Sequence, residues 1–255
     1  MSRHVFLSPH FDDAIFSCGG TIHQLRQQGQ RVLIITVMGG GAPHDFPHTP
    51  ITQELHARWQ AGTEPTSARQ REDEEAARKL GAELLRLDVP DCIYRAVNGV
   101  PLYPTEAALW GEIHPLDRLQ DWLPEDPFTE AFIADTQTLY APLGVGQHVD
   151  HRLVRGWAVA LQARHPELNV QFYTDFPYMK DSSKIIQAIN NFDLVVQPRW
   201  VYLDEHDLSA KVDAMACYES QISTFWADKE AMKRDVHLSF RIKTELWGER
   251  YWARA

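Results

Sequence analysis

The chain of 255 residues has few cysteines and no long hydrophobic run. Its three cysteines, Cys18, Cys92 and Cys217, are widely spaced and form no CxxC pair, so neither a disulfide framework nor a thiolate zinc site is expected. No apolar run approaches the roughly 18 residues that a membrane span needs. The N-terminus also lacks the charged and apolar regions of a signal peptide. We therefore expect a cytoplasmic protein whose thiols are reduced.

Positive charge is scarce as well. The chain has 25 Lys and Arg against 35 Asp and Glu, a formal net charge of −10, which disfavours nucleic acid as a partner. No GxGxxG fingerprint follows the first apolar run, so a dinucleotide-binding role has no support. The apolar content of 44% is ordinary for a globular protein. With no repeat or linker visible, we expect residues 1–255 to form a single domain.

Apolar runs alternate with helical patterns along most of the chain. The runs predict strands at the ranges 5–7, 32–38, 83–89, 135–141 and 170–174, with helices at 13–28, 67–80 and 151–164 between them. A strand–helix–strand order implies right-handed crossovers and parallel strands covered on both faces. The fold class that we predict is a Rossmann-like, three-layer α/β/α structure with a mostly parallel central sheet.

Other stretches have a weaker pattern. Residues 42–68 lack a clear period and predict a long loop at the substrate side. Residues 94–128 form an insertion-like region, whose Trp110 and Trp122 we expect to fill a satellite core. Towards the C-terminus we expect short strands at 193–197 and 200–203, a helix at 208–220 and a tail, 238–252, that packs on the domain.

A first polar cluster follows the first strand. His10, Asp12 and Asp13 stand at the carboxyl end of that strand, where open α/β sheets bind ligands. Histidine nitrogen and carboxylate oxygen together suit Zn²⁺ or a similar divalent ion. Asp12 lies between the two and would be free to act as a general base. The alternative is that one aspartate merely caps the following helix.

A second polar cluster follows the apolar segment at 138–143. Two histidines and an aspartate, His148, Asp150 and His151, come directly after a glycine-containing turn. One of these histidines would complete a His-Asp-His ligand set and leave the fourth position open for water, as in catalytic zinc sites. Taken together, the two clusters favour a metal site over a helix cap.

The two clusters resemble the signatures of the PIG-L/LmbE-like deacetylases, a family of metal-dependent N-acetylglucosaminyl deacetylases. The family usually carries Pro-His-Pro-Asp-Asp-Glu, and this chain has Pro9-His10-Phe11-Asp12-Asp13-Ala14. The second signature, His-x-Asp-His, is matched by His148-Val149-Asp150-His151. Phe11 and Ala14 depart from the pattern and resemble a variant branch of the family. Neither is a ligand position, so the departures bear on the substrate.

The resemblance implies a role for each residue of the clusters. It implies His10, Asp13 and His151 as ligands of Zn²⁺, or of another divalent metal such as Fe²⁺. It implies Asp12 as the general base. It also implies that His148, in its charged form, stabilises the tetrahedral intermediate, and that Asp150 orients His148.

Two further resemblances concern the substrate. Counting back from Leu80-Gly81 aligns Arg69 with an Arg-x-x-Glu pattern of the family, which implies that Arg69 reaches the sugar. Arg71 is the alternative if the register differs. Tyr178 ends a Phe-Pro-Tyr segment that is similar to the family's aromatic-Pro-Tyr segment near the substrate rim.

These resemblances imply a zinc-dependent hydrolase that removes an N-acetyl group from an N-acetylglucosamine-type sugar or glycoconjugate. The partner would then be a small-molecule amino-sugar substrate. Two alternatives stay open: an amidase acting on another amide, such as a thiol conjugate, and a catalytically inactive sugar-binding relative. The sequence also leaves open whether the protein forms a homo-oligomer.

Overall fold

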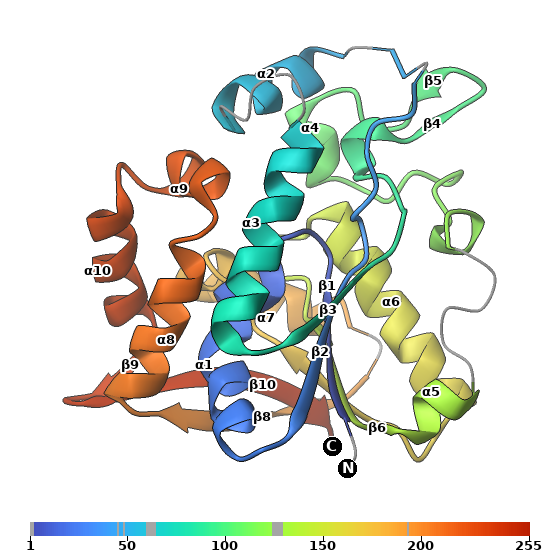
Figure 1. Cartoon of the computed structure of the whole chain (residues 1–255). Helices are drawn as coiled ribbons and strands as arrows, with labels where there is room; N and C mark the ends of the chain where they lie inside the picture. Colours follow the sequence, from blue (N-terminus) through green and yellow to red (C-terminus); the bar gives the residue numbers. More distant parts are fainter. Residues whose placement is uncertain (1–2, 45, 48, 60–64, 124–129, 193) are drawn as a thin grey trace.

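The structure is a computed structural model, which describes residues 3–44, 46–47, 49–59, 65–123, 130–192 and 194–255. A single eight-stranded sheet runs through the described residues in the order β3-β2-β1-β6-β7-β10-β8, with β9 paired to β10 (Figure 1). Its strands are β1 (Arg3–Ser8), β2 (Arg31–Thr36), β3 (Glu83–Arg86), β6 (Thr136–Pro142), β7 (Asn169–Tyr173), β8 (Val196–Leu203), β9 (Arg241–Lys243) and β10 (Leu246–Arg254).

The five strands from β3 to β7 are parallel, as the alternation of apolar runs and helices predicted. Side chains alternate between the two faces along each strand, and both faces are buried. In β1, Val5 and Leu7 point into one apolar core and Phe6 into the other. This double burial explains why the strands are continuous apolar runs in the sequence.

Helices cover both faces of the sheet (Figure 1). On one side, the core lies under α1 (Asp13–Gln27), α3 (Pro65–Leu80), α8 (Glu205–Met215) and α10 (Lys229–Ser239). On the other side, it lies under α6 (Val149–Arg164) and α7 (Ser182–Asn190). This arrangement confirms the predicted three-layer α/β/α fold.

The C-terminal tail departs from its prediction. Instead of packing on the domain as a tail, it forms β10, which lies between β7 and β8 and is antiparallel to both. One inward-facing position of β10 is Glu249, which is buried and forms an ion pair with Lys211. A charged residue at that position hides the apolar alternation by which a strand is recognised.

Three other segments differ from their predictions. Within the stretch at 42–68, Pro50–Trp59 forms the helix α2. The two short strands expected around residue 200 are one edge strand, β8. The helix expected at 208–220 is two helices, α8 and α9 (Glu219–Phe225), because an Asp204–Asp207 capping box starts α8 earlier and the chain turns after Met215. Residues 48, 60–64 and 193 lie outside the described residues.

The insertion-like region at 94–128 contains only short elements up to residue 123. These are the 3₁₀ turn η1 (Cys92–Tyr94), a hairpin of β4 (Ala96–Val97) and β5 (Val100–Pro101), α4 (Glu106–Leu109) and η2 (Leu119–Asp121). The following α5 (Glu130–Ala134) leads into β6. A separate apolar cluster joins this region to α2.

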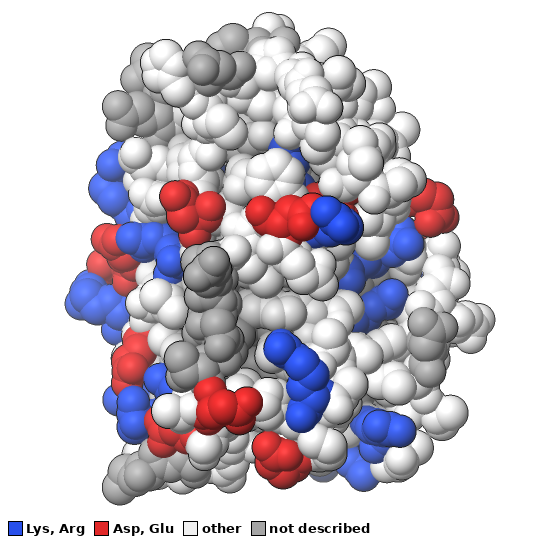
Figure 2. All heavy atoms as spheres, turned by 90° about the vertical axis from the view of Figure 1, so that its right-hand side faces the viewer, with Lys and Arg blue, Asp and Glu red and all other residues white. Residues whose placement is uncertain are grey.

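The surface mixes charges of both signs. Figure 2 shows the face on the right of Figure 1, where Lys and Arg side chains are interspersed with Asp and Glu side chains and separated by uncharged area. The described residues of this face therefore form no basic stripe of the kind that nucleic-acid-binding proteins carry. Among the described helices, none is both long and apolar enough to cross a membrane.

Candidate metal centre

The loop from β1 to α1 places the first polar cluster. The Ser8 hydroxyl donates to the His10 carbonyl and accepts from the Ala14 N–H, so it ties the two ends of the loop together. Asp12 occupies the N-cap position of α1, yet its side chain makes no capping hydrogen bond. Asp13 accepts a hydrogen bond from the His10 N–H, at 2.8 Å. The alternative that an aspartate merely caps the helix is therefore wrong for Asp12.

The Asp13 carboxylate lies between two histidines from opposite ends of the sequence. Its Oδ2 is 3.1 Å from His10 Nδ1, and its Oδ1 is 3.3 Å from His151 Nε2. In a tetrahedral zinc site, ligands about 2.0–2.2 Å from the metal lie roughly 3.3 Å from one another. The two contacts of Asp13, one through each carboxylate oxygen, have about this length and are compatible with a shared metal ion.

Each of the two histidines has an inner ring nitrogen, which faces Asp13, and an outer ring nitrogen, which points away from it. The outer nitrogens each face another carboxylate. His10 Nε2 is 3.0 Å from Asp150 Oδ2, and His151 Nδ1 is 2.6 Å from Asp175 Oδ1. Histidines that bind metals usually donate their second ring N–H to a carboxylate, which fixes the ring and leaves the other nitrogen for the metal. The inner nitrogens, which face Asp13, are the ones left available here.

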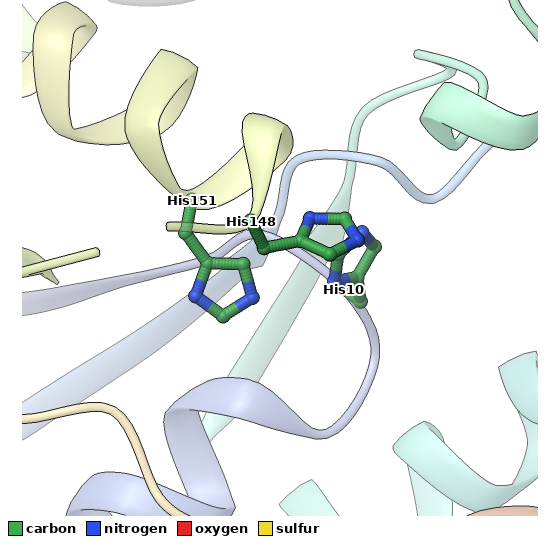
Figure 3. Close-up of side chains that lie close together, drawn as sticks. All are labelled: His10, His148 and His151. Carbon is green, nitrogen blue, oxygen red and sulfur yellow. The ribbon is translucent and has the colours of Figure 1, made fainter. Parts of the chain in front are cut away.

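His148 brings a third imidazole to the same place (Figure 3). One nitrogen from each of His10, His148 and His151 lies within 4.8 Å of the others. His148 is the N-cap of α6, and its Nδ1 accepts a hydrogen bond from the Asp150 N–H at 3.3 Å. With Nδ1 occupied as an acceptor, the ring proton belongs on Nε2. The Asp13 carboxylate contacts both His10 and His151, which makes it a further candidate ligand.

Carboxylates outnumber cations around this centre. Five surround it, Asp12, Asp13, Asp91, Asp150 and Asp175, against the guanidiniums of Arg69 and Arg95. Burial alone would lower the pKa of His151, but Asp13 and Asp175 raise it to about 10. The carboxylates thus favour positive charge at this place, and a divalent ion bound by the deprotonated histidines would supply it, so the residues present fit a metal ion.

His148 has a different electrostatic environment from the other two histidines. Burial and the neighbouring His10 hold the pKa of His148 well below its ordinary value. This environment favours the neutral imidazole over the charged form that was expected. A neutral imidazole with its proton on Nε2 still donates a hydrogen bond into the cavity.

Asp150 also differs from its expected role. Its carboxylate is fully buried, accepts hydrogen bonds from Arg95 and from the Cys92 N–H, and contacts His10. Burial by itself would raise the pKa of Asp150, but Arg95 and His10 hold it below its ordinary range. Its carboxylate thus orients His10, and only its backbone N–H supports His148.

Asp12 is placed for proton transfer. It is 6% exposed, and its Oδ1 lies 3.6 Å from a guanidinium nitrogen of Arg69. Burial and the charge of Asp13 raise the pKa of Asp12 to about 6, despite the opposing effect of Arg69. A carboxyl that titrates this close to neutrality is well matched to a general base.

A pocket of about 230 Å³ opens over the centre, and both predicted substrate residues line it. Arg69 lies between the rings of Phe11 and Trp59, and its buried Nε has no hydrogen-bond partner. Arg71 is exposed instead, so the first register is the one that faces the pocket. Tyr178 packs on Gly146, where an added Cβ would lie 3.1 Å from the tyrosine ring.

The structure adds residues that the sequence analysis missed. Asp175 directly follows the strand predicted at 170–174, and this position at the carboxyl end of β7 was an available signal. Arg95, which holds Asp150, lies in the insertion-like region, where no pattern marked it. Trp110 was expected in a satellite core, but it lines the pocket with its ring 5.0 Å from that of His148. Trp122 is half-buried against the main core under α6 and not in a satellite core.

Comparison with known proteins agrees with this geometry. The family model described as PIG-L, GlcNAc-PI de-N-acetylase, matches residues 5–162. A 2'-N-acetylparomamine deacetylase of Niallia circulans is 33% identical over 197 residues, which cover 72% of this chain and 70% of that protein.

Solved structures give the same result for the fold. A deacetylase–teicoplanin complex from the biosynthesis of teicoplanin is 22% identical with a TM-score of 0.80, covering 100% of this chain and 99% of that one. A pseudoaglycone deacetylase for another antimicrobial reagent is 26% identical with a TM-score of 0.71, covering 99% and 96%. The chain therefore belongs to the PIG-L family and is a deacetylase.

Proposed function

We propose that this deacetylase is zinc-dependent and removes the N-acetyl group from an N-acetylglucosamine-type sugar or glycoconjugate. One observation carries the metal proposal. The inner nitrogens of His10 and His151 face Asp13, while the carboxylates of Asp150 and Asp175 hold their outer nitrogens. His10, Asp13 and His151 would hold the ion. When bound, it would supply Lewis-acid chemistry that polarises a water and the amide carbonyl.

The remaining residues divide the proton chemistry between them. Asp12, beside the ligand Asp13, takes the proton of the attacking water and returns it to the leaving amine. His148 Nε2 donates a hydrogen bond to the oxygen that becomes negative in the tetrahedral intermediate. Its position at the N-terminus of α6 adds the positive end of the helix dipole at the same place.

The pocket supports a sugar as substrate. Arg69 lines the pocket, and one of its terminal nitrogens lies 3.6 Å from Asp12, too far for a hydrogen bond, so it is available to neighbouring hydroxyl groups. Asp91 Oδ2 lies 3.9 Å from Arg69 and 3.7 Å from His10, at distances too long for hydrogen bonds. Donor and acceptor thus stand together in the pocket. The relatives act on sugar-bearing compounds, an N-acetylated paromamine and teicoplanin.

Two general features of the structure support the proposed single domain and the proposed cytoplasmic location. One sheet includes both β1 and β10, which supports a single domain over residues 1–255. All three cysteines are free, and Cys18 and Cys92 are buried, which supports a reducing, cytoplasmic location.

The test combines metal analysis with an assay of acetate release. The purified protein is analysed for bound metal, and acetate release from N-acetylglucosamine glycosides is followed with and without chelator. We expect about one metal ion per chain and activity that chelation abolishes and added Zn²⁺ restores. Zn²⁺ should be titrated, because one solved teicoplanin deacetylase is a zinc-inhibited form. Full activity after metal removal would contradict zinc dependence, and bound metal without acetate release would contradict the substrate.

A further inference from the structure

A second pocket adjoins the first. It has a volume of about 280 Å³ and lies between η3 (Tyr178–Lys180) and the end of α9. Two of its lining residues, Tyr178 and Phe225, also line the pocket over the metal centre. The two pockets therefore share a wall that includes these two side chains.

An unbroken series of aromatic rings runs from the metal centre into the second pocket. The ring of His148 contacts that of Trp110, with centroids 5.0 Å apart, and Trp110 contacts Tyr178 at 5.3 Å. Tyr178 in turn faces Phe225 at 6.4 Å, and Phe225 contacts Trp226 at 5.5 Å. Such rings offer flat apolar faces, on which sugars and aromatic groups pack well.

The two volumes fit a substrate larger than one sugar. Small-molecule sites usually measure about 300–1,000 Å³. The pocket over the metal, at about 230 Å³, is below that range alone, and the two pockets together fall within it. The first pocket has room for the acetylated sugar, so the group attached to that sugar must extend elsewhere.

Charge in the second pocket is largely balanced. Lys180 Nζ forms an ion pair with Asp235 at 2.8 Å. Lys184 and Asp181, which also line the pocket, carry opposite charges. The formal charges therefore cancel, and the rest of the lining is apolar or aromatic: Pro177, Tyr178, Phe225 and Trp226.

We propose that the second pocket holds the aglycone of the substrate, an aromatic or alkyl group on the sugar whose N-acetyl group lies at the metal centre. This inference rests on the proposed function. Phe225 and Tyr178 pack against the bond that joins sugar and aglycone, and Trp226 packs against the aglycone itself. An enzyme of this design prefers sugar conjugates to the free sugar.

The test compares two substrates, the methyl and the phenyl β-glycosides of N-acetylglucosamine. For the wild type we expect kcat/KM to be about tenfold higher for the phenyl glycoside. In Trp226→Ala this ratio should fall to about threefold or less. Any loss of folded enzyme affects both substrates equally and cancels in the ratio. Trp226→Phe keeps a ring but loses the indole hydrogen bond to Asp235, so it should keep most of the wild-type ratio.

Three outcomes would overturn the inference. The first is a wild-type ratio near one, and the second is a Trp226→Ala ratio equal to that of the wild type. The third is that Trp226→Ala lowers kcat/KM for an N-octanoyl methyl glycoside and leaves kcat/KM for the phenyl glycoside unchanged. The last would place the acyl group in the pocket. If neither glycoside is hydrolysed, the proposed function fails. The inference is then tested by calorimetry, in which the ratio of the binding affinities for the phenyl and methyl glycosides takes the place of the ratio of kcat/KM values.

Discussion

The aspartates of the metal centre have the same chemistry and different neighbours, and the neighbours decide what each can do. Asp150 is held by Arg95 and a backbone N–H, and Asp175 by the N–H groups of Gly144 and Val145. Both are fixed acceptors that orient histidines. Asp12 lies 3.6 Å from the guanidinium of Arg69, and burial beside Asp13 raises its pKa to about 6. It is therefore the aspartate that we propose as the general base.

Replacing this carboxylate should separate catalysis from metal binding. We expect Asp12→Asn to lower kcat by at least about 100-fold, because the amide cannot accept the water's proton. The metal content should remain that of the wild type, since Asp12 makes no contact with either proposed histidine ligand. Elemental analysis and acetate release measure the two effects. Wild-type activity in this variant would refute the assignment of the base.

The carboxylate behind His151 should matter for metal affinity. The Asp175 carboxylate contacts His151 through one oxygen and accepts hydrogen bonds from the two backbone N–H groups through the other. The amide of Asp175→Asn has only one oxygen and cannot do both, so we expect zinc affinity to fall about 10- to 100-fold. Competition with a chromogenic chelator measures it. Asp228→Asn is the matched control, because Asp228 is an exposed cap of α10 that is remote from the ion. Equal affinities in both variants would count against the role of Asp175.

At the scale of elements, α1 is positioned by its contacts with α8 and β10. A Cβ added at Gly19 would lie 2.9 Å from Lys211 Cγ, so the glycine allows α8 to approach closely. The buried Lys211 donates to Glu249 of β10, and Glu249 accepts from the Gly20 and Thr21 N–H groups of α1. Because α1 starts at the metal centre, this network also supports the first polar cluster from behind.

Breaking this buried ion pair should be costly. Lys211→Met leaves Glu249 buried without its cation, and we expect a loss of about 3–5 kcal/mol in the free energy of unfolding. Urea denaturation followed by circular dichroism measures it. Lys229→Met removes an exposed partner of Glu219 and should cost less than about 1 kcal/mol. If the two variants lose similar amounts, the pair adds no more than a surface salt bridge.

At the scale of the whole molecule, the metal centre joins distant parts of the chain. Its groups come from the loops after β1, β3, β6 and β7, and all of these strands end at the same edge of the sheet. Five carboxylates meet there, and two of them, Asp13 and Asp175, raise the pKa of His151 to about 10. A divalent ion that binds only the folded chain would stabilise the fold by mass action.

Removal of the metal should therefore lower the melting temperature. With free metal at about 100 times its dissociation constant, binding contributes about 2.7 kcal/mol, which corresponds to roughly 5–10 °C in a chain of this size. Thermal denaturation of the chelated and the zinc-restored protein measures the shift. His151→Ala, which lacks a ligand, should melt at the same temperature in both conditions. An unchanged melting temperature in the wild type would argue against a metal bound at this centre.

Residue types and local order determined much about this protein. The apolar runs, read with the helical patterns between them, predicted the parallel strands and the α/β/α layers, because buried parallel strands must be apolar on both faces. The two His- and Asp-containing clusters predicted the residues of the centre, since each cluster follows a strand. Both inferences need only neighbours in the chain.

Tertiary structure alone decided the partners of each polar group. The Asp150 carboxylate contacts His10, and burial beside His10 lowers the pKa of His148. Arg95 reaches Asp150 from a region where the sequence shows no pattern. The strand β10 was hidden because its buried Glu249 is satisfied by Lys211 of a distant helix. In each case the deciding term is a hydrogen bond or a charge between residues far apart in sequence, and no local pattern records it.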